Sequence, residues 1–117
     1  MPGNSQMAIL SRLMDVAALR QRIHGENLNN QNVPGYRARA VAFEDAFREA
    51  LESGDDPTTV QATIYEPRNT PPQNDGNDVN PDQEVLASAQ NALLYNTYVA
   101  MARGQQKLLA TAISAAP

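Results

Sequence analysis

Oxygen-bearing side chains gather between residues 75 and 82, where the sequence reads Asp-Gly-Asn-Asp-Val-Asn-Pro-Asp. Carboxylate and amide oxygens at alternate positions are the ligands of a calcium-binding loop. This run lacks the third ligand and the glycine at the required position, and no glutamate stands twelfth from Asp75. We therefore expect no calcium site in this segment.

His24 is the sole histidine and the chain contains no cysteine, so no second histidine or thiolate can complete a metal site with it. A lone histidine on an apolar helix face is more often a packed, hydrogen-bonded core residue than a ligand or a catalyst. The acidic residues lie in predicted loops or on solvated helix faces, so no base or nucleophile is positioned for catalysis. The sequence predicts a protein that is not an enzyme and has no metal, cofactor or small-molecule substrate.

The amino-acid composition further restricts the class of protein and its expected partners. A chain of 117 residues with 42% hydrophobic content and a net charge of -4 is typical of one soluble domain. The chain has only nine Lys and Arg residues and no basic stripe, so nucleic acid is not an expected partner. Ser11, Arg12 and Asp15 interrupt the apolar run near the N-terminus, so we expect no cleaved signal peptide.

The N-terminal part of the chain predicts an amphipathic helix from about Ser5 to Asn30. Its apolar residues fall on one broad face at helical spacing; they are Ile9, Leu10, Leu13, Val16, Ala17, Ile23 and Leu28. Arg20, His24 and Asn27 interrupt the middle of that face rather than its edge. Arg20 could pair with an acidic residue or extend to water.

This helix is expected to end at a sharp corner. Pro34 disfavours helical backbone at Val33, and the Asn30 side chain can bond one of the last helical carbonyls. Pro34 and Gly35 suit the second and third positions of a type II turn. The sequence therefore predicts such a turn from Val33 to Tyr36.

The middle of the chain predicts little regular structure. Apolar residues at four-residue spacing indicate one short helix; they are Phe43, Phe47 and Leu51. Gly54 would end this helix, and Glu44 and Arg48 could pair across one turn. Prolines and polar clusters mark residues 57–82 as a connecting segment, although the alternation within residues 60–65 is consistent with one short strand.

The C-terminal part predicts a long helix that begins at Pro81. Asn80 can cap it, proline fits its first position, Asp82 complements the helix dipole and Gln83 stands at the capping-box position. No charged residue occurs between Val85 and Ala102. Amide side chains within this stretch argue against stable membrane insertion, because lipid could not satisfy them; they include Gln90, Asn91 and Asn96.

Two apolar rows cover most of the circumference of this last helix. One contains Val85, Ala89, Ala92, Leu93, Val99 and Ala100, and the other contains Leu94, Tyr98, Met101, Leu108 and Ala112. A two-helix hairpin buries only one face of each helix, so the other faces would stay wet in a monomer. Burial of apolar surface contributes roughly 25 cal/mol of stabilisation per Å², so a few hundred Å² left exposed to water would lose several kcal/mol of stability. We therefore expect contacts with other chains and a marginal or frayed monomer.

The expected fold is mainly α. Residues 1–33 and 81–117 form long axial helices that pair as a hairpin or a coiled-coil-like layer. Residues 34–80 hold the turn, the short helix and an irregular Pro/Asn/Asp-rich segment with room for a short β element. Contacts with other chains are expected at Leu13, Val16, Ile23, Asn27, Leu28, Asn30, Leu94, Tyr98, Met101 and Leu108.

Two stretches resemble a known family. Residues 27–36 resemble the Asn-apolar-x-Asn-x-x-Thr-Pro-Gly-Tyr signature of bacterial flagellar rod and hook proteins, with departures at Asn29 and Val33. Residues 75–84 are similar to the Asp-Gly-Asn-x-Val-Asp-x-Asp-x-Glu segment of proximal rod proteins, with Asn80 and Pro81 at the departing positions. The run from Tyr36 to Arg39, followed by Phe43, is also similar to that family.

The resemblance implies a structural subunit of the proximal rod of the flagellar basal body, in the periplasm, exported by the flagellar type III apparatus without a cleaved signal peptide. It also implies that the terminal helices pack in the inner layer of a tubular rod. The implied partners are copies of the chain, other rod proteins and the export-gate or adaptor components. Asn27 and Asn30 are then either packing residues shared with that family or ordinary residues at a helix end. The alternative is a small secreted helical-hairpin binding module or an export chaperone.

Overall fold

The computed structural model describes residues 2–115. Two long helices, α1 (Pro2–Asn29) and α3 (Pro81–Ala115), enclose a middle segment of shorter elements in the sequence. These are β1 (Ala40–Ala42), α2 (Glu44–Ser53), a single 3-10 turn (Pro57–Thr59) and β2 (Thr63–Tyr65). The mainly helical fold that the sequence predicts is confirmed, with helices at both ends and a small β element between them.

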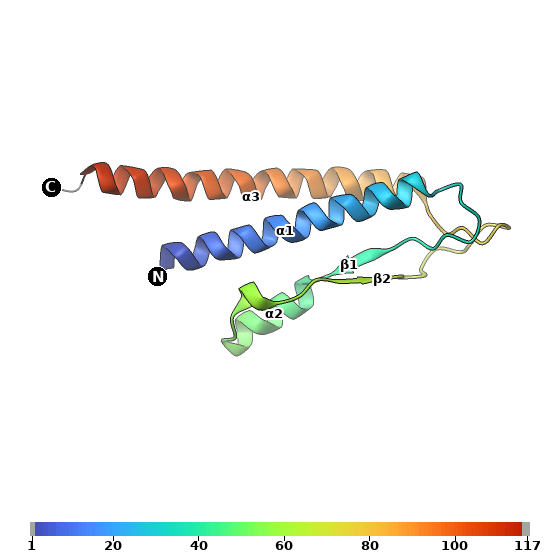
Figure 1. The fold of residues 1–117 in the computed structure, drawn as a ribbon, viewed down its shortest axis with the longest axis horizontal. Coiled ribbons are helices and arrows are strands. Elements are labelled where there is room, and N and C mark those ends of the chain that lie inside the picture. The colour runs from blue at the N-terminus through green and yellow to red at the C-terminus, as the bar shows by residue number, and fades with distance from the viewer. Residues whose placement is uncertain (1, 116–117) are drawn as a thin grey trace.

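The molecule is elongated. α1 lies between α3 on one side and the strands with α2 on the other (Figure 1). The principal extents are 70 × 28 × 14 Å and the radius of gyration is 18.3 Å, whereas a compact chain of this length would have a radius of gyration of about 13 Å. At its C-terminal end α3 continues past the N-terminal end of α1 (Figure 1). Among the described helices and strands, α1 is the main neighbour of α3.

The core lies between α1 and the middle segment. Val16 and Ile23 of α1 are buried with Val41 and Phe43. Around this cluster pack Leu13, Leu19, Phe47, Val60 and Ala62. The rings of Phe43 and Phe47 are 5.2 Å apart between centroids. This core is small, so it stabilises α1 and the middle segment but leaves most of α3 outside it.

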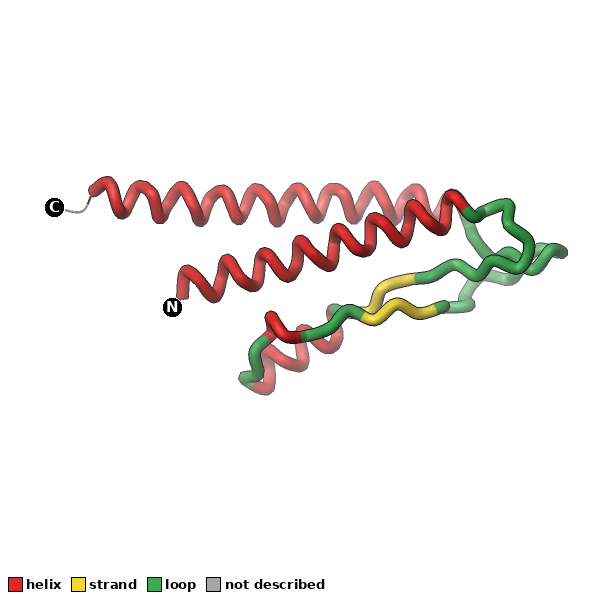
Figure 2. Tube along the Cα trace, viewed as in Figure 1, coloured by secondary structure: helices red, strands yellow, loops and turns green. Residues whose placement is uncertain are grey.

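The β element is a ribbon of two strands that runs beside α1 (Figure 2). β1 and β2 pair in antiparallel register, with Val41 opposite Ile64. The alternation within residues 60–65 correctly indicated β2. β1 was not predicted, because alanine has low strand propensity and two of its three residues are alanine. Pairing with β2 and packing on α1 hold it extended.

The predicted end of α2 and the predicted start of α3 are confirmed, but one predicted ion pair is not formed. Gly54 closes α2 in the left-handed conformation with φ of 79°, and α3 begins at Pro81. The predicted ion pair between Glu44 and Arg48 is wrong. Glu44 instead accepts two hydrogen bonds from Arg20 of α1, because a guanidinium matches both carboxylate oxygens at once. Arg48 lies 3.3 Å from Asp45.

Candidate assembly surface

The corner after α1 is built around a buried amide. The Asn27 side chain is fully buried, and its Nδ2 donates to the Arg39 carbonyl at 2.8 Å while its Oδ1 accepts from the Arg39 N–H at 3.0 Å. The Tyr36 hydroxyl donates to the same Oδ1 at 3.2 Å. One asparagine thus pairs with the returning backbone as a strand would. This contact explains why Asn27 interrupts the apolar face of α1.

A second buried amide joins the corner to the start of α3. Asn77 is also fully buried, and its Nδ2 donates to the carbonyls of Asn30 and Val33 at 2.9 and 2.8 Å. Its Oδ1 accepts from the Val79 N–H at 2.9 Å. The carbonyls at the end of a helix have no partner within that helix. Asn77 supplies one from 47 residues away.

The two stretches that the sequence analysis singled out therefore form one structure. The Gly35 N–H donates to the Asp75 carbonyl at 2.8 Å. Asp78 is buried, and its carboxylate accepts from the Ala38 N–H at 2.6 Å and from Arg37 at 3.3 Å. The oxygen-rich run from 75 to 82 thus uses Asp78 and Asn77 as partners for the backbone of the corner.

Glycine is required where these two loops meet. Gly35 has φ of 77° and the Tyr36 N–H donates to the Val33 carbonyl at 3.2 Å, which is the geometry of a type II turn. Gly76 has φ of 85°, and a Cβ on it would lie 3.3 Å from the Gly35 Cα. Pro34 is exposed beside them. A side chain at Gly76 would therefore crowd the other loop, whereas one at Gly35 would meet open space and strain only the backbone, through its positive φ.

Arg20 and His24, which also interrupt the apolar face of α1, have partners within the chain as well. Arg20 donates to both oxygens of Glu44 and to the Val41 carbonyl at 2.9 Å. The hydrogen bond from Arg20 lowers the pKa of Glu44 from its ordinary value of 4.5. His24 Nδ1 lies 2.7 Å from an oxygen of Glu84, and both side chains are only 14% exposed. His24 is accordingly a packed, hydrogen-bonded residue between α1 and α3.

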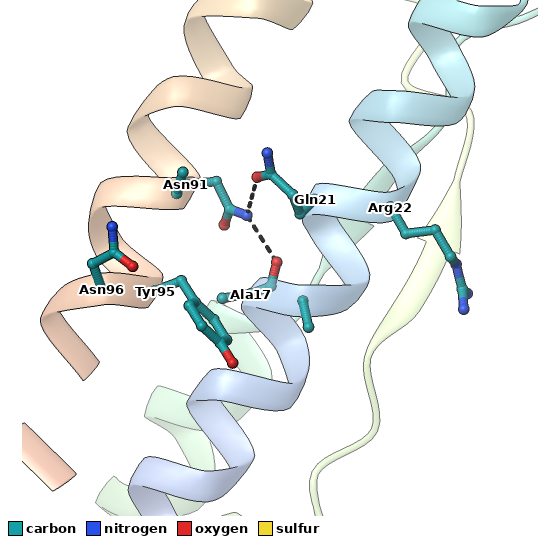
Figure 3. A pocket seen from close by; sticks show the side chains of 8 residues that line it. Ala17, Gln21, Arg22, Asn91, Tyr95 and Asn96 are labelled. Atoms are coloured by element: carbon teal, nitrogen blue, oxygen red, sulfur yellow. Dashed lines mark hydrogen bonds between the residues drawn. The ribbon is translucent and has the colours of Figure 1, made fainter. Parts of the chain in front are cut away.

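Small and amide side chains line the contact between α1 and α3. Asn91 is buried, and its Nδ2 donates to the Ala17 carbonyl at 2.8 Å and to Gln21 Oε1 at 2.9 Å (Figure 3). Gln21 Nε2 donates to the Ser88 hydroxyl at 2.6 Å. Beside these contacts lies a groove of about 430 Å³. Its lining is Ala17, Ala18, Gln21, Arg22, Asn91, Ala92, Tyr95 and Asn96.

The rest of α3 carries large apolar side chains in contact with solvent. We call this set the α3 apolar surface: Val85, Leu86, Leu93, Leu94, Tyr95, Met101, Leu108, Leu109 and Ile113. Their exposed fractions range from 37% at Tyr95 to 69% at Leu93. Exposed apolar residues that follow one another along a helix indicate an interaction surface, whereas isolated ones do not. None of the described helices combines the length and hydropathy that crossing a bilayer requires.

The residues predicted at contacts between chains lie in two different environments. Val16, Ile23 and Asn27 are buried by their own chain, and Leu13 packs against the core. Leu28 and Asn30 are partly buried, and Asn30 donates to the Glu26 carbonyl. Leu94, Met101 and Leu108 are 40%, 52% and 67% exposed. Tyr98 is partly buried, and its burial together with the Glu44 carboxylate raises the pKa of its phenol.

Sequence reasoning missed several residues with clear structural roles. Leu86, Leu109 and Ile113 are more exposed than Leu94, and a fully apolar circumference gave no signal to choose among them. The sequence placed Asn77 and Asp78 in a rejected calcium loop and in the stretch that resembles rod proteins, but it did not indicate which groups they bond. Asn80 does act as a cap, since its Oδ1 accepts from the Gln83 N–H at 3.2 Å.

No protein-family model matches the chain. It is 28% identical to the flagellar basal body rod protein FlgB of Escherichia coli K12 and to that of Shigella flexneri. Each alignment spans 113 residues and covers 80% of this chain and 82% of the relative. The FlgB protein of Yersinia enterocolitica is also 28% identical over the same shares. Over most of its length, this chain is therefore similar to the FlgB flagellar basal body rod proteins, in agreement with the resemblance that its two motifs carry.

Proposed function

We propose that this chain is a structural subunit of the proximal rod of the flagellar basal body, and that it assembles through the α3 apolar surface. Its relatives are named rod proteins, which supports a structural role rather than a catalytic one. The observation that carries the assembly proposal is the exposure of large apolar side chains along α3. Neighbouring chains would cover this surface.

The energetics favour such a partner. Burying the remaining exposed area of a half-exposed leucine stabilises a contact by roughly 1 kcal/mol. Many such side chains follow one another on α3, from Val85 to Ile113. The stretch between Val85 and Ala102 carries no charge, so covering it with another helix would desolvate no ion. From Val85 to Met101, the α3 apolar surface therefore gains free energy from assembly without the opposing cost of burying charge.

The proposal extends to partners and location. The partners are copies of this chain and other rod proteins, in lateral and axial contacts, together with export-gate or adaptor components at the base. The location is the periplasmic rod. Similarity to rod proteins over 80% of the chain supports this over a secreted binding module or an export chaperone.

A pair of matched substitutions tests the assembly surface. In a strain that lacks its own copy of the gene, Met101→Asp should abolish incorporation into purified basal bodies, because the contact would bury a carboxylate. Leu51→Asp is the control: Leu51 is 51% exposed on α2 and Met101 is 52% exposed on α3. Circular dichroism of both purified variants should match the unmodified chain. Normal incorporation of a folded Met101→Asp protein, or equal loss from Leu51→Asp, would contradict the assignment of assembly to α3.

A further inference from the structure

Apolar character alone does not determine which side of α3 faces α1. Leu94, Met101 and Leu108 recur at seven-residue spacing, which is the spacing of a coiled-coil contact. All three are nonetheless at least 40% exposed. A rotation of α3 by roughly 80° would turn this row toward α1. Something other than apolar burial therefore selects the observed side.

The side that does face α1 is polar at its corner end. Three residues of α3, Glu84, Ser88 and Asn91, contact α1 at successive helical turns. Their partners on α1 are His24, Gln21 and the Ala17 carbonyl with Gln21, at distances between 2.6 and 2.9 Å. We call this set the polar seam. Each step of three or four residues along α3 matches a similar step back along α1, as antiparallel helices require.

The polar seam can form in only one arrangement of the two helices. Asn91 is only 6% exposed and its amide has two acceptors on α1. If α3 slid by one turn toward the corner, Glu84 would approach Leu28 and lose the imidazole of His24. If α3 rotated, Asn91 would leave both acceptors. A buried polar group without a hydrogen-bond partner destabilises the fold. Other arrangements of the two helices are therefore less stable even where they bury more apolar area.

We propose that Asn91, together with the pair of His24 and Glu84, selects the side and the register with which α3 packs on α1. A single buried asparagine fixes register in some coiled coils at a cost in stability. Here the selection keeps the row of Leu94, Met101 and Leu108 turned away from α1. That this free row then meets a neighbouring subunit rests on the proposed function. The selection itself is a property of the isolated chain.

Distance measurement between the helices tests the selection directly. The chain has no cysteine, so spin labels can be attached to Asp15→Cys on α1 and Gln106→Cys on α3, two exposed positions that are staggered along the helix axes, so that a slide changes the distance between them. The otherwise unmodified chain should give one distance population. Asn91→Leu should give a second or broadened population, since a slide by one turn moves the labels by about 5 Å. Its thermal midpoint should be unchanged or raised by up to about 5 °C, because an apolar side chain replaces a buried amide.

A matched control and a second variant make the result decisive. Asn96→Leu makes the same change at an exposed position of α3 and should keep one distance population. Glu84→Leu removes the other end of the polar seam and should broaden the distances if Asn91→Leu does not fold. A single, unchanged distance in Asn91→Leu, whether its midpoint falls or rises, would overturn the proposal. These measurements use the monomer, so their outcome is independent of whether Met101→Asp blocks assembly.

Discussion

The corner after α1 and the α3 apolar surface differ in whether their side chains have partners within the chain. At the corner, Asn27 and Asn77 are fully buried and every amide hydrogen bond described above is made within the chain. On α3, leucines and a methionine are half or more exposed and have no such partner. The first region is complete in the monomer, whereas the proposed function assigns the cover of the second to another chain. Stability and assembly should therefore depend on different residues.

The largest expected effect separates these two kinds of residue. Ile23 is 1% exposed in the core and Leu93 is 69% exposed on α3. Ile23→Ala should lower the free energy of unfolding by about 3 kcal/mol, because it leaves a cavity. Leu93→Ala should change it by less than about 0.5 kcal/mol. Urea titration of both variants measures the difference, and similar losses would mean that Leu93 is packed in the monomer.

A smaller effect is expected at the corner. Asn77→Ala would remove the donor for the Asn30 and Val33 carbonyls and the acceptor for the Val79 N–H. We expect a loss of roughly 2 kcal/mol in the free energy of unfolding, since the buried Val79 N–H would lack an acceptor and the two carbonyls would keep only the N–H groups of Val33 and Tyr36. Asn74→Ala, at an exposed position in the same loop, should leave stability unchanged. If the two variants unfold at the same urea concentration, the corner is not held by Asn77.

The smallest effect concerns the ion pair between α1 and α2. The pKa of Glu44 lies below its ordinary value of 4.5 in the folded chain, mainly through the hydrogen bond from Arg20. The pair therefore stabilises the fold above pH 4.5, and this contribution disappears as the pH falls through the lowered pKa. Because the Glu44 side chain is 55% exposed, Glu44→Gln should cost less than about 1 kcal/mol at pH 7.

Urea titrations at pH 7 and pH 3 check this dependence. The difference between the unmodified chain and Glu44→Gln should shrink as the pH is lowered from 7 to 3, because protonation of the Glu44 carboxyl removes the ion pair. Glu52→Gln, at an exposed position of the same helix, should show little difference at either pH. A difference for Glu44→Gln that stays constant across this range would exclude the ion pair as its cause.

The sequence was sufficient to predict features that short-range chemistry decides. Asn80 and Pro81 mark the start of α3, Pro34 and Gly35 mark the turn, and Gly54 marks the end of α2. Each of these features depends on residues only a few positions apart. The family resemblance also rested on such local stretches, and the comparison with FlgB proteins confirmed it.

Features that depend on distant residues were not predictable in the same way. Asn77 bonds carbonyls 44 and 47 residues away, and Asn91 bonds one 74 residues away. The sequence shows that asparagines are present but not which backbone groups they reach. β1 escaped prediction for a similar reason, since its partner strand begins 21 residues after it ends. The exposed side of α3 was not predictable either, because it depends on the polar seam, whose partners on α1 lie 60 to 74 residues away in the sequence.

The elongated shape has a practical consequence for anyone who purifies this protein. A rod-like particle diffuses more slowly than a sphere of equal mass, and this chain has a radius of gyration of 18.3 Å where about 13 Å would suit a sphere-like fold. Size-exclusion columns calibrated with globular standards will overestimate its molecular weight. Elution at the volume of a dimer is thus expected from a single chain, and light scattering or sedimentation equilibrium must decide the oligomeric state.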